Sequence, residues 1–218
     1  MIKFAPEGLP FIAGAAAVTV AVLAAVRNWI ATIPFIITLF MFYFFRDPER
    51  VTPVDAGAVI SPADGKILLV KEVREQEFLR QEVRKISIFM SPLNVHVNRA
   101  PCDGEVVSVT HTPGSFKKAF LDEASMHNDN IAMVLKTSKG SILLRQIAGS
   151  IARRPVCRVA PGDTLRQGQR YGIIKFSSRV DIYLPMTAAV IVKPGDKVLA
   201  GETVIARWSS AAAAEGTK

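Results

Sequence analysis

The dipeptide Gly149-Ser150 is the feature of this sequence with the clearest potential for chemistry. It follows the strand-like segment 141–147, and glycine permits a strained turn that other residues avoid. In such a turn the Ser150 hydroxyl can attack the Gly149 carbonyl carbon. Acyl transfer and elimination would then cut the chain and convert Ser150 into a pyruvoyl group. Gly-Ser is also common in ordinary turns, so the dipeptide indicates self-cleavage only in a supporting context.

Residues 1–45 are predicted to attach the chain to a membrane. Leu9 to Val26 contains no charged residue, and a second apolar run extends from Trp29 to Phe45. Each run is close to the ~17–25 residues that a helix needs to cross a bilayer, which predicts a hairpin of two spans. Because Pro34 would kink the second helix, a re-entrant or interfacial hairpin is the alternative. Basic residues follow the second run, so the positive-inside rule predicts that the rest of the chain lies on the cytoplasmic side of the inner membrane.

Residues 46–58 are predicted to be a linker, and residues 59–218 a mainly β domain of the α+β class. Its β-branched segments, separated by Pro and Gly, are typical of short strands. These segments are residues 66–73, 85–90, 104–110, 131–137, 141–147, 170–176 and 180–184. The only candidate helix in this domain is 117–125.

Two phrases recur in the β domain and predict internal pseudo-symmetry. Residues 61–67 resemble residues 100–106, and residues 161–169 resemble residues 194–202. Each phrase places a Pro and an Asp-Gly or Gly-Asp turn at the start of an extended segment. The second phrase resembles the barrel-sandwich hybrid fold of lipoyl and biotinyl domains, a likeness at the level of fold.

Charge and cysteine spacing argue against nucleic-acid binding and against a metal site. The net charge is +8, yet the basic residues lack the aromatic interleaving of a single-strand binder. The mean hydropathy of the chain is high, at +0.27. The excess of basic residues therefore suits an anionic membrane surface better than nucleic acid. Cys102 and Cys157 have no second Cys or His at metal-binding spacing, so we expect two small buried side chains and no metal site.

The context of Gly149-Ser150 carries a family resemblance. The motifs are RQIAGSIARRPVC, FFRDPER, SPADGKI, FMSPLNVHVNRAPCDG, YGIIKFSSRVDIYLP and PGDKVLAGET. From about Phe44 to Ala206 their order and spacing are similar to those of the short-form phosphatidylserine decarboxylases. The resemblance implies self-cleavage between Gly149 and Ser150 and a covalent pyruvoyl cofactor made from Ser150.

The same resemblance implies the reaction and the partners. Phosphatidylserine of the membrane would be converted to phosphatidylethanolamine and carbon dioxide through a Schiff base on the pyruvoyl group, without a separate cofactor. The two cleavage products would stay together as a heterodimer. Acyl-chain preference and the number of protomers, a homo-oligomer included, are left open.

Two positions, His96 and Asp64, are candidates for acid and base chemistry. His96 matches the histidine of a family motif, and a proton donor is needed after carbon dioxide leaves. Asp64 matches a family position tied to self-cleavage, although a plain turn aspartate is an equal alternative. The longer bacterial branch has a further histidine where this chain has Arg99, so the base for self-cleavage is left open. His111 is expected in a surface loop. His127 precedes Asn128-Asp129-Asn130, where the family usually shows Asn-Glu-Arg, and we assign it no role.

Substrate binding is assigned to basic and hydroxyl side chains near the cleavage point. Arg153, Arg154, Ser178 and Arg179 could hold the phosphate and carboxylate by charge-assisted hydrogen bonds, the alternative being a solvated basic edge. The family usually shows Gly at the position of Ser177.

Two other functions compete. A membrane-anchored lipoyl-like interaction module would be free of catalysis, but the expected hairpin-tip lysine is missing beside Met186. A pyruvoyl decarboxylase acting on a soluble amino acid would gain nothing from the apolar N-terminus.

Overall fold

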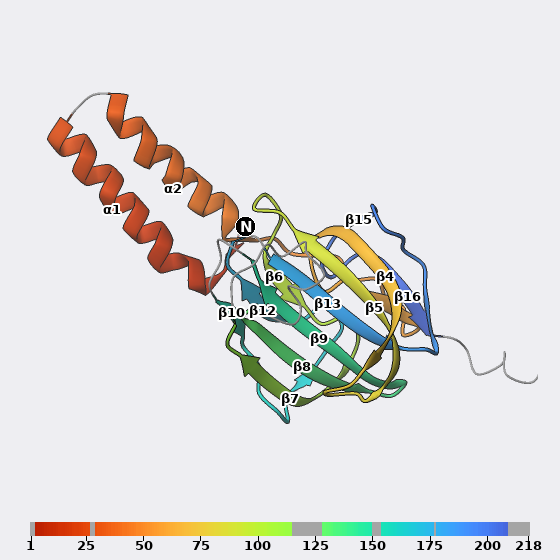
Figure 1. The fold of residues 1–218 in the computed structure, drawn as a ribbon. Helices are drawn as coiled ribbons and strands as arrows, with labels where there is room; N and C mark the ends of the chain where they lie inside the picture. The colour runs from red at the N-terminus through yellow and green to blue at the C-terminus, as the bar shows by residue number, and fades with distance from the viewer. Residues whose placement is uncertain (1–2, 27–28, 115–127, 150–153, 177, 209–218) are drawn as a thin grey trace, which may run out of the picture. The chain divides into compact units, whose positions relative to one another are not determined.

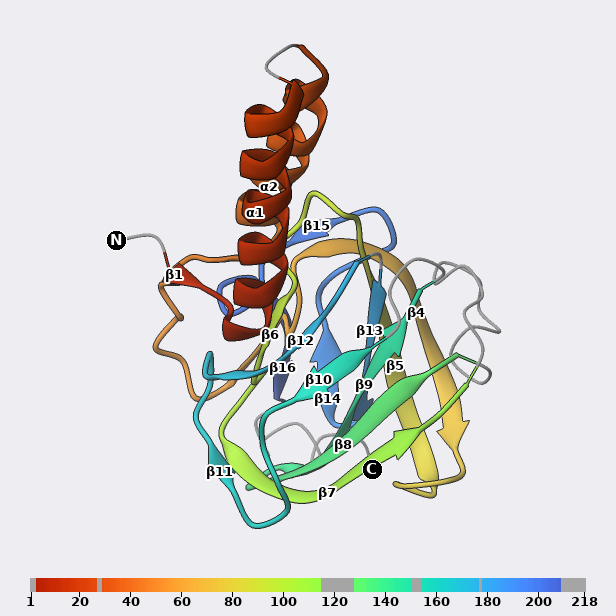
Figure 2. The ribbon, with the colours of Figure 1, turned by 90° about the vertical axis from the view of Figure 1, so that its left-hand side faces the viewer.

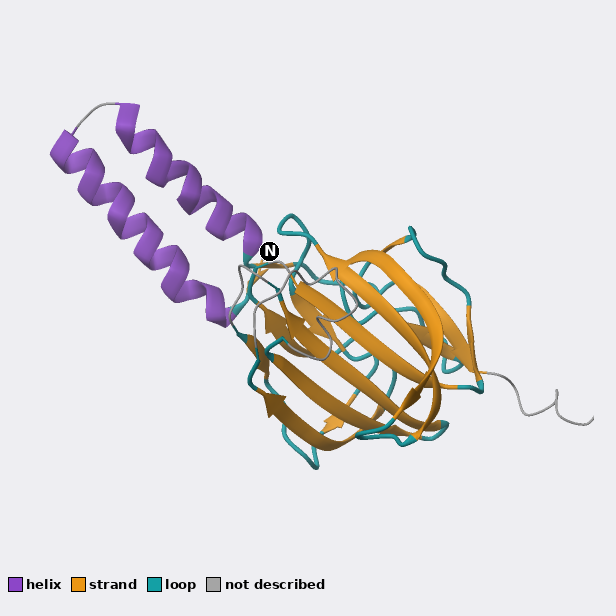
Figure 3. Cartoon of the chain, viewed as in Figure 1, coloured by secondary structure: helices purple, strands orange, loops and turns teal. Residues whose placement is uncertain are grey.

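The computed structural model of this chain describes residues 3–26, 29–114, 128–149, 154–176 and 178–208. The described residues fall into two compact units, drawn in Figures 1 and 3. The helical unit comprises residues 1–49 and 92–95, and the β unit comprises residues 50–91 and 96–218.

The helical unit is built on two antiparallel apolar helices. Its elements are β1 (Lys3–Phe4), η1 (Pro6–Gly8), α1 (Leu9–Val26), η2 (Trp29–Ala31), α2 (Thr32–Phe44) and β2 (Arg46–Asp47). Pro34 lies in the first turn of α2, where a backbone N–H would lack an intrahelical partner anyway, so the expected kink does not arise.

Polar groups between the two helices are satisfied internally. Thr19 Oγ1 donates to Ala15 O and Thr38 Oγ1 donates to Pro34 O, each at 2.9 Å, and the two hydroxyl oxygens are 3.0 Å apart. Apolar side chains cover the outer faces. Among the described residues, one helix, Pro6–Val26, is long and apolar enough to cross a membrane, whereas Trp29–Phe44 is shorter. The unit suits lipid, where polar groups must find partners within the protein.

The described strands of the β unit form one eight-stranded and two three-stranded antiparallel sheets. The large sheet has the order β11 (Thr164–Leu165), β7 (Gly104–Thr112), β8 (Asn130–Thr137), β9 (Gly140–Ala148), β13 (Ser178–Pro185), β5 (Gln81–Met90), β4 (Gly65–Glu75) and β15 (Lys197–Val198). The small sheet has the order β10 (Pro155–Cys157), β12 (Arg170–Ile174) and β6 (Val97–Arg99). The third sheet has the order β14 (Ala188–Val190), β16 (Val204–Trp208) and β3 (Ala58–Ile60).

The large sheet curls around the main apolar core, as Figure 2 shows. Alternate residues along β13 point to opposite faces, so Val180, Ile182 and Leu184 enter this core while Tyr183 joins a second cluster. The mainly β fold with an N-terminal pair of apolar helices is confirmed. So are all seven predicted strands, whereas residues 117–125 lie outside the described part of the chain.

The recurring phrases produce matching structure. The turn before β15 and the turn before β11 each contain a glycine at positive φ, Gly195 at 101° and Gly162 at 94°. Ile67 N–H donates to Asp196 O at 2.9 Å, and Val106 N–H donates to Asp163 O at 2.8 Å. A register shift follows both Ile67 in β4 and Val106 in β7. The two halves of the large sheet are therefore built alike, and β9 meets β13 where they join.

Candidate active site

The predicted cleavage point lies just beyond the end of β9. Ala148 is the last residue of this strand, and it pairs with Ser178 at the start of β13. The backbone N–H of Ala148 donates to Asp129 O at 2.9 Å, and Asn128 Nδ2 donates to Ala148 O at 2.7 Å. The acyl side of the predicted scissile bond is thus held by hydrogen bonds, and Gly149 is buried. Ser150 and Arg153 lie outside the described residues.

The small sheet brings His96 to the residues that follow the cleavage point. Pro155, which begins β10, pairs with Ile174 at the end of β12. The N–H of Ile174 donates to the carbonyl oxygen of His96 at 3.2 Å. His96 is fully buried and directly precedes β6. Strand pairing alone therefore places His96 and Pro155 at one end of the small sheet.

A buried glutamine links the two sheets near this end. Gln146, on β9, donates from Nε2 to Asn98 Oδ1 at 2.8 Å and to Val156 O at 3.3 Å. Asn98 belongs to β6 and Val156 to β10. Within the described residues, the buried Oε1 atom of Gln146 has no hydrogen-bond partner. A free acceptor is therefore left close to the cleavage strand.

A cavity of about 550 Å³ lies against residues that follow the cleavage point. Its lining comprises His111, Pro113, Gly114, Asp129, Ile131, Arg154 and Pro155. His111 Nε2 lies 2.5 Å from Asp129 Oδ1; the histidine side chain is 54% exposed and that of the aspartate 9%. His111 is exposed as expected, but the predicted surface loop is wrong, because His111 lies within β7 and pairs with Asp129. Arg154 is exposed and lines the same cavity, and substrate binding by this residue stays a prediction.

Ser178 and Arg179 are both fully buried. The Ser178 hydroxyl lies 3.4 Å from Met90 Sδ, and the Arg179 guanidinium donates to both oxygens of Asp181, at 2.6 and 2.9 Å. Lys85 Nζ lies 3.0 Å from the same carboxylate. These contacts favour a structural role for Arg179, and substrate binding by either residue stays a prediction.

The charge of Asp181 is fixed by its neighbours. Burial would raise the pKa of its carboxyl, but hydrogen bonds from Arg179 and the charges of Arg179 and Lys85 outweigh burial and lower the pKa to about 2. Asp181 is therefore ionised throughout the physiological pH range.

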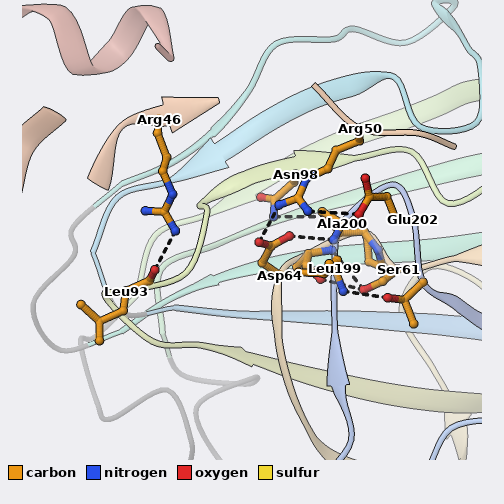
Figure 4. Close-up of polar contacts among 12 residues, drawn as sticks. Arg46, Arg50, Ser61, Asp64, Leu93, Asn98, Leu199, Ala200 and Glu202 are labelled. Atoms are coloured by element: carbon orange, nitrogen blue, oxygen red, sulfur yellow. Dashed lines mark hydrogen bonds and ion pairs between the residues drawn. The ribbon is translucent and has the colours of Figure 1, made fainter. Parts of the chain in front are cut away.

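Asp64 lies in a saturated turn, shown in Figure 4. Its Oδ2 accepts from Arg50 Nη2 at 2.8 Å, and its Oδ1 accepts from the Ala200 N–H at 2.7 Å. In the second half of the sheet, the equivalent Asp103 accepts from the Gln167 N–H at 2.7 Å. The shared contact favours a turn-closing role for Asp64, and its part in self-cleavage stays a prediction. Arg99 donates from Nη1 to Gly168 O at 3.0 Å.

Cys102 is buried, as expected, whereas Cys157 is only half-buried. Burial and the nearby Asp103 raise the pKa of Cys102 to about 12, and burial also raises the pKa of Cys157. Across the described part of the chain, no group of three or more His, Cys, Asp or Glu side chains is arranged to hold a metal ion.

Comparison with known proteins gives the family. Residues 37–206 match the family described as phosphatidylserine decarboxylase. The chain belongs to this family. It is 47% identical over 205 residues to the phosphatidylserine decarboxylase proenzyme of Desulfotalea psychrophila, covering 94% of this chain and 96% of the relative. It is 48% identical over 206 residues to the proenzyme of Nitrosomonas europaea, covering 94% of each chain. The resemblance inferred from the motifs is thereby confirmed.

In this phosphatidylserine decarboxylase family member, sequence reasoning missed four residues of the site. Gln146, Asn128, Asp129 and His111 surround the end of β9 through the contacts described above. The Asn128-Asp129-Asn130 segment was recognised only as a departure from the family pattern. A polar triplet immediately before an apolar strand was the available signal, but it names no partner.

Proposed function

We propose that this chain decarboxylates phosphatidylserine to phosphatidylethanolamine by means of a pyruvoyl group made from Ser150. The observation that carries the proposal is the match to phosphatidylserine decarboxylase proenzymes over 94% of the chain. The folding of the cleavage strand supports it, because two sheets direct candidate groups to the end of β9.

The residues around the cleavage point fit a pyruvoyl group. A pyruvoyl group only accepts hydrogen bonds, and the cavity lined by His111 and Arg154 provides side-chain donors next to Pro155, which follows the cleavage point. When present, a pyruvoyl group supplies Schiff-base chemistry and accepts the electrons released as the substrate carboxylate departs. Asn128 would keep the Ala148 peptide in place through its 2.7 Å hydrogen bond.

Other side chains bind the substrate and move protons. Arg154, exposed in the cavity, would hold the anionic headgroup by charge-assisted hydrogen bonds, with Arg153 adjacent in sequence. Ser178, beside Ala148, could contact the headgroup only from a buried position. His96 would return a proton to the α-carbon, and its burial excludes bulk water from that step.

The two cleavage products would remain one folded unit. β13, which follows the cleavage point, pairs on one side with β9 and on the other with β5, both of which precede it. Separation of the products would break both ladders in the middle of the large sheet. A stable heterodimer follows from this topology.

Membrane attachment is part of the proposal, with the β unit on the cytoplasmic side of the inner membrane. The apolar helix Pro6–Val26 would be buried in lipid, near a substrate that is itself a lipid. We therefore expect the protein to pellet with membranes and stay there at about 1 M salt, where the Debye length is only ~3 Å. Complete release by salt would show that attachment is peripheral.

The test of the proposed function is decarboxylation by the purified protein in detergent with phosphatidylserine micelles. The expected products are carbon dioxide and phosphatidylethanolamine, and Ser150→Ala should give neither. Free serine supplied instead should stay intact, which separates the lipid substrate from a soluble amino acid. Failure of the cleaved parental protein to release carbon dioxide from either substrate would reject the proposal and favour an interaction module.

A further inference from the structure

Self-cleavage at Gly149-Ser150, which belongs to the proposed function, requires a base that the sequence does not identify. Arginine does not lose its proton in proteins, so Arg99 cannot serve. Both carboxylate oxygens of Asp64 are engaged by Arg50 and by the Ala200 N–H. His96 is assigned to the later decarboxylation. The inference drawn below rests on the proposed function and concerns the formation of its catalytic group.

The His111–Asp129 pair is positioned for this role by the register of three adjacent strands. His111, on β7, pairs with Ile131 of β8, and Asn130 of β8 pairs with Ile147 of β9. Asp129 therefore lies between His111 and the end of β9. Its side chain contacts His111 Nε2 at 2.5 Å, and its carbonyl oxygen accepts the Ala148 N–H at 2.9 Å. One residue thus touches both the imidazole and the strand that ends at the cleavage point.

The His111 side of the His111–Asp129 pair faces the cavity. Asp129 is buried, whereas His111 lines the cavity together with Arg154 and Pro155. The cavity is consequently bordered on one side by the segment hydrogen-bonded to Ala148 and on another by residues that follow the cleavage point. An aspartate that accepts the Nε2 proton fixes the ring and leaves Nδ1 as the basic nitrogen, which is the aspartate–histidine relation of hydrolase triads with the two ring nitrogens exchanged.

We propose that His111, oriented by Asp129, is the general base of self-cleavage. His111 takes the Ser150 hydroxyl proton as the oxygen bonds to the Gly149 carbonyl carbon, and the proton passes to the Ser150 nitrogen as the peptide C–N bond breaks. The resulting ester joins Gly149 to the Ser150 side chain. His111 is a catalytic residue of this step, and Asp129 is a positioning residue.

The same base completes the reaction. It removes the α-proton of residue 150, the electron pair forms the Cα–Cβ double bond, and the ester C–O bond breaks to release the Gly149 carboxylate. The dehydroalanine left at the new N-terminus tautomerises to an imine, as Cβ gains a proton and the nitrogen loses one. Water then adds to the imine and ammonia leaves, which gives the pyruvoyl group.

The test follows the conversion of full-length chain into two products during cell-free synthesis with detergent. His111→Ala should slow conversion by about 10²–10⁴, the usual value of a positioned base. Added imidazole should speed the conversion of His111→Ala again, whereas it should have no effect on Ser150→Ala. Asp129→Asn should also slow conversion, by about tenfold or more, because the ring loses its tautomer and orientation. Glu72→Gln, which breaks the exposed Arg84–Glu72 pair at 3.3 Å, is the matched control and should convert at the parental rate.

His111→Gln keeps a hydrogen-bonding group beside Asp129 but cannot take up a proton. Parental conversion by this variant would show that His111 acts only structurally and would overturn the proposal. So would parental conversion by His111→Ala, or slow conversion of a folded His111→Ala chain that imidazole does not restore. These outcomes differ from failure of the proposed function, in which the parental chain itself would not convert.

Discussion

The two halves of the large sheet share an architecture but differ where their hairpins end. In the half formed by β15, β4, β5 and β13, the turn after β4 is closed by Glu75, whose carboxylate accepts the N–H groups of residues 77–80. Burial would raise the pKa of Glu75, yet these hydrogen bonds lower it. In the half formed by β11, β7, β8 and β9, the corresponding end carries the His111–Asp129 pair and a cavity.

The two carboxylates, Glu75 and Asp129, occupy corresponding ends of the two halves but have different partners. A carboxylate saturated by its own turn can only stabilise that turn, whereas a carboxylate bound to an imidazole beside a cavity can govern proton transfer. The turns at the starts of β4 and β7 are alike in both halves and serve structure. We therefore expect substitutions at the end of β9 to change reactions, and substitutions elsewhere in the sheet to change stability.

The largest effect on turnover is expected at His96, which lies at the same end of the small sheet as Pro155. His96→Ala should lower turnover of phosphatidylserine by about 10²–10⁴, because the α-carbon loses its proton donor. Turnover must be divided by the cleaved fraction, measured by mass spectrometry. Glu75→Gln, in the other half, should keep parental turnover. A fully cleaved His96→Ala protein with parental turnover would assign the proton donor to another group.

Asp181 provides the corresponding test of stability. Asp181→Ala leaves Arg179 and Lys85 buried without this carboxylate, which should cost about 3–5 kcal/mol of unfolding free energy. Asp129→Asn weakens the His111–Asp129 pair, in which His111 is exposed, and should cost less than about 1 kcal/mol. Urea unfolding in a Ser150→Ala background, where the chain stays whole, gives both values. Equal losses of unfolding free energy would show that the carboxylates of Asp181 and Asp129 do not differ in their contribution to stability.

Strong acid should remove the stabilising contribution of the Asp181 carboxylate. The folded pKa of Asp181 is about 2, below the ~3.9 of an unfolded aspartate. Its contribution is therefore complete above about pH 4 and is lost as the pH falls toward 2, on the order of 2 kcal/mol in total. The unfolding free energy of Asp181→Asn should lack this part of the pH dependence. An unchanged slope between pH 4 and 2 would show that Asp181 is not the group responsible.

The smallest difference is expected between the repeat-related aspartates. Asp64→Asn weakens a charged pair with Arg50 as well as a turn contact, and should cost about 1–2 kcal/mol. Asp103→Asn loses only charge at an exposed turn and should cost about 0.5–1 kcal/mol. Both chains should still cleave, as seen by gel electrophoresis. A folded Asp64→Asn chain that stays whole would restore Asp64 to the cleavage machinery.

Much of the scaffold could be read from the sequence because its signals are local. The repeats at 61–67 and 100–106 reappear as equivalent turns, since Gly, Pro and Asp impose the same backbone geometry on both. The apolar runs gave the helices, although Pro34 proved harmless because the helix begins only two residues earlier.

The site could be predicted only where a motif named its residues. The segment around Gly149 was found from its neighbours in sequence. The His111–Asp129 contact depends on the register between β7 and β8, which no local pattern specifies. The burial of Arg179 likewise depends on the face of β13 to which it points and on Asp181 being available there. Long-range pairing thus decides which charged residues face solvent.

Self-cleavage at Gly149-Ser150 is best tested by the intact mass of the purified protein. We expect two chains, residues 1–149 and a small chain from position 150 whose N-terminus resists Edman degradation and gains mass on borohydride reduction. Ser150→Ala should give one chain with the full sequence mass. An active parental protein consisting only of the uncut chain would show that activity does not need self-cleavage.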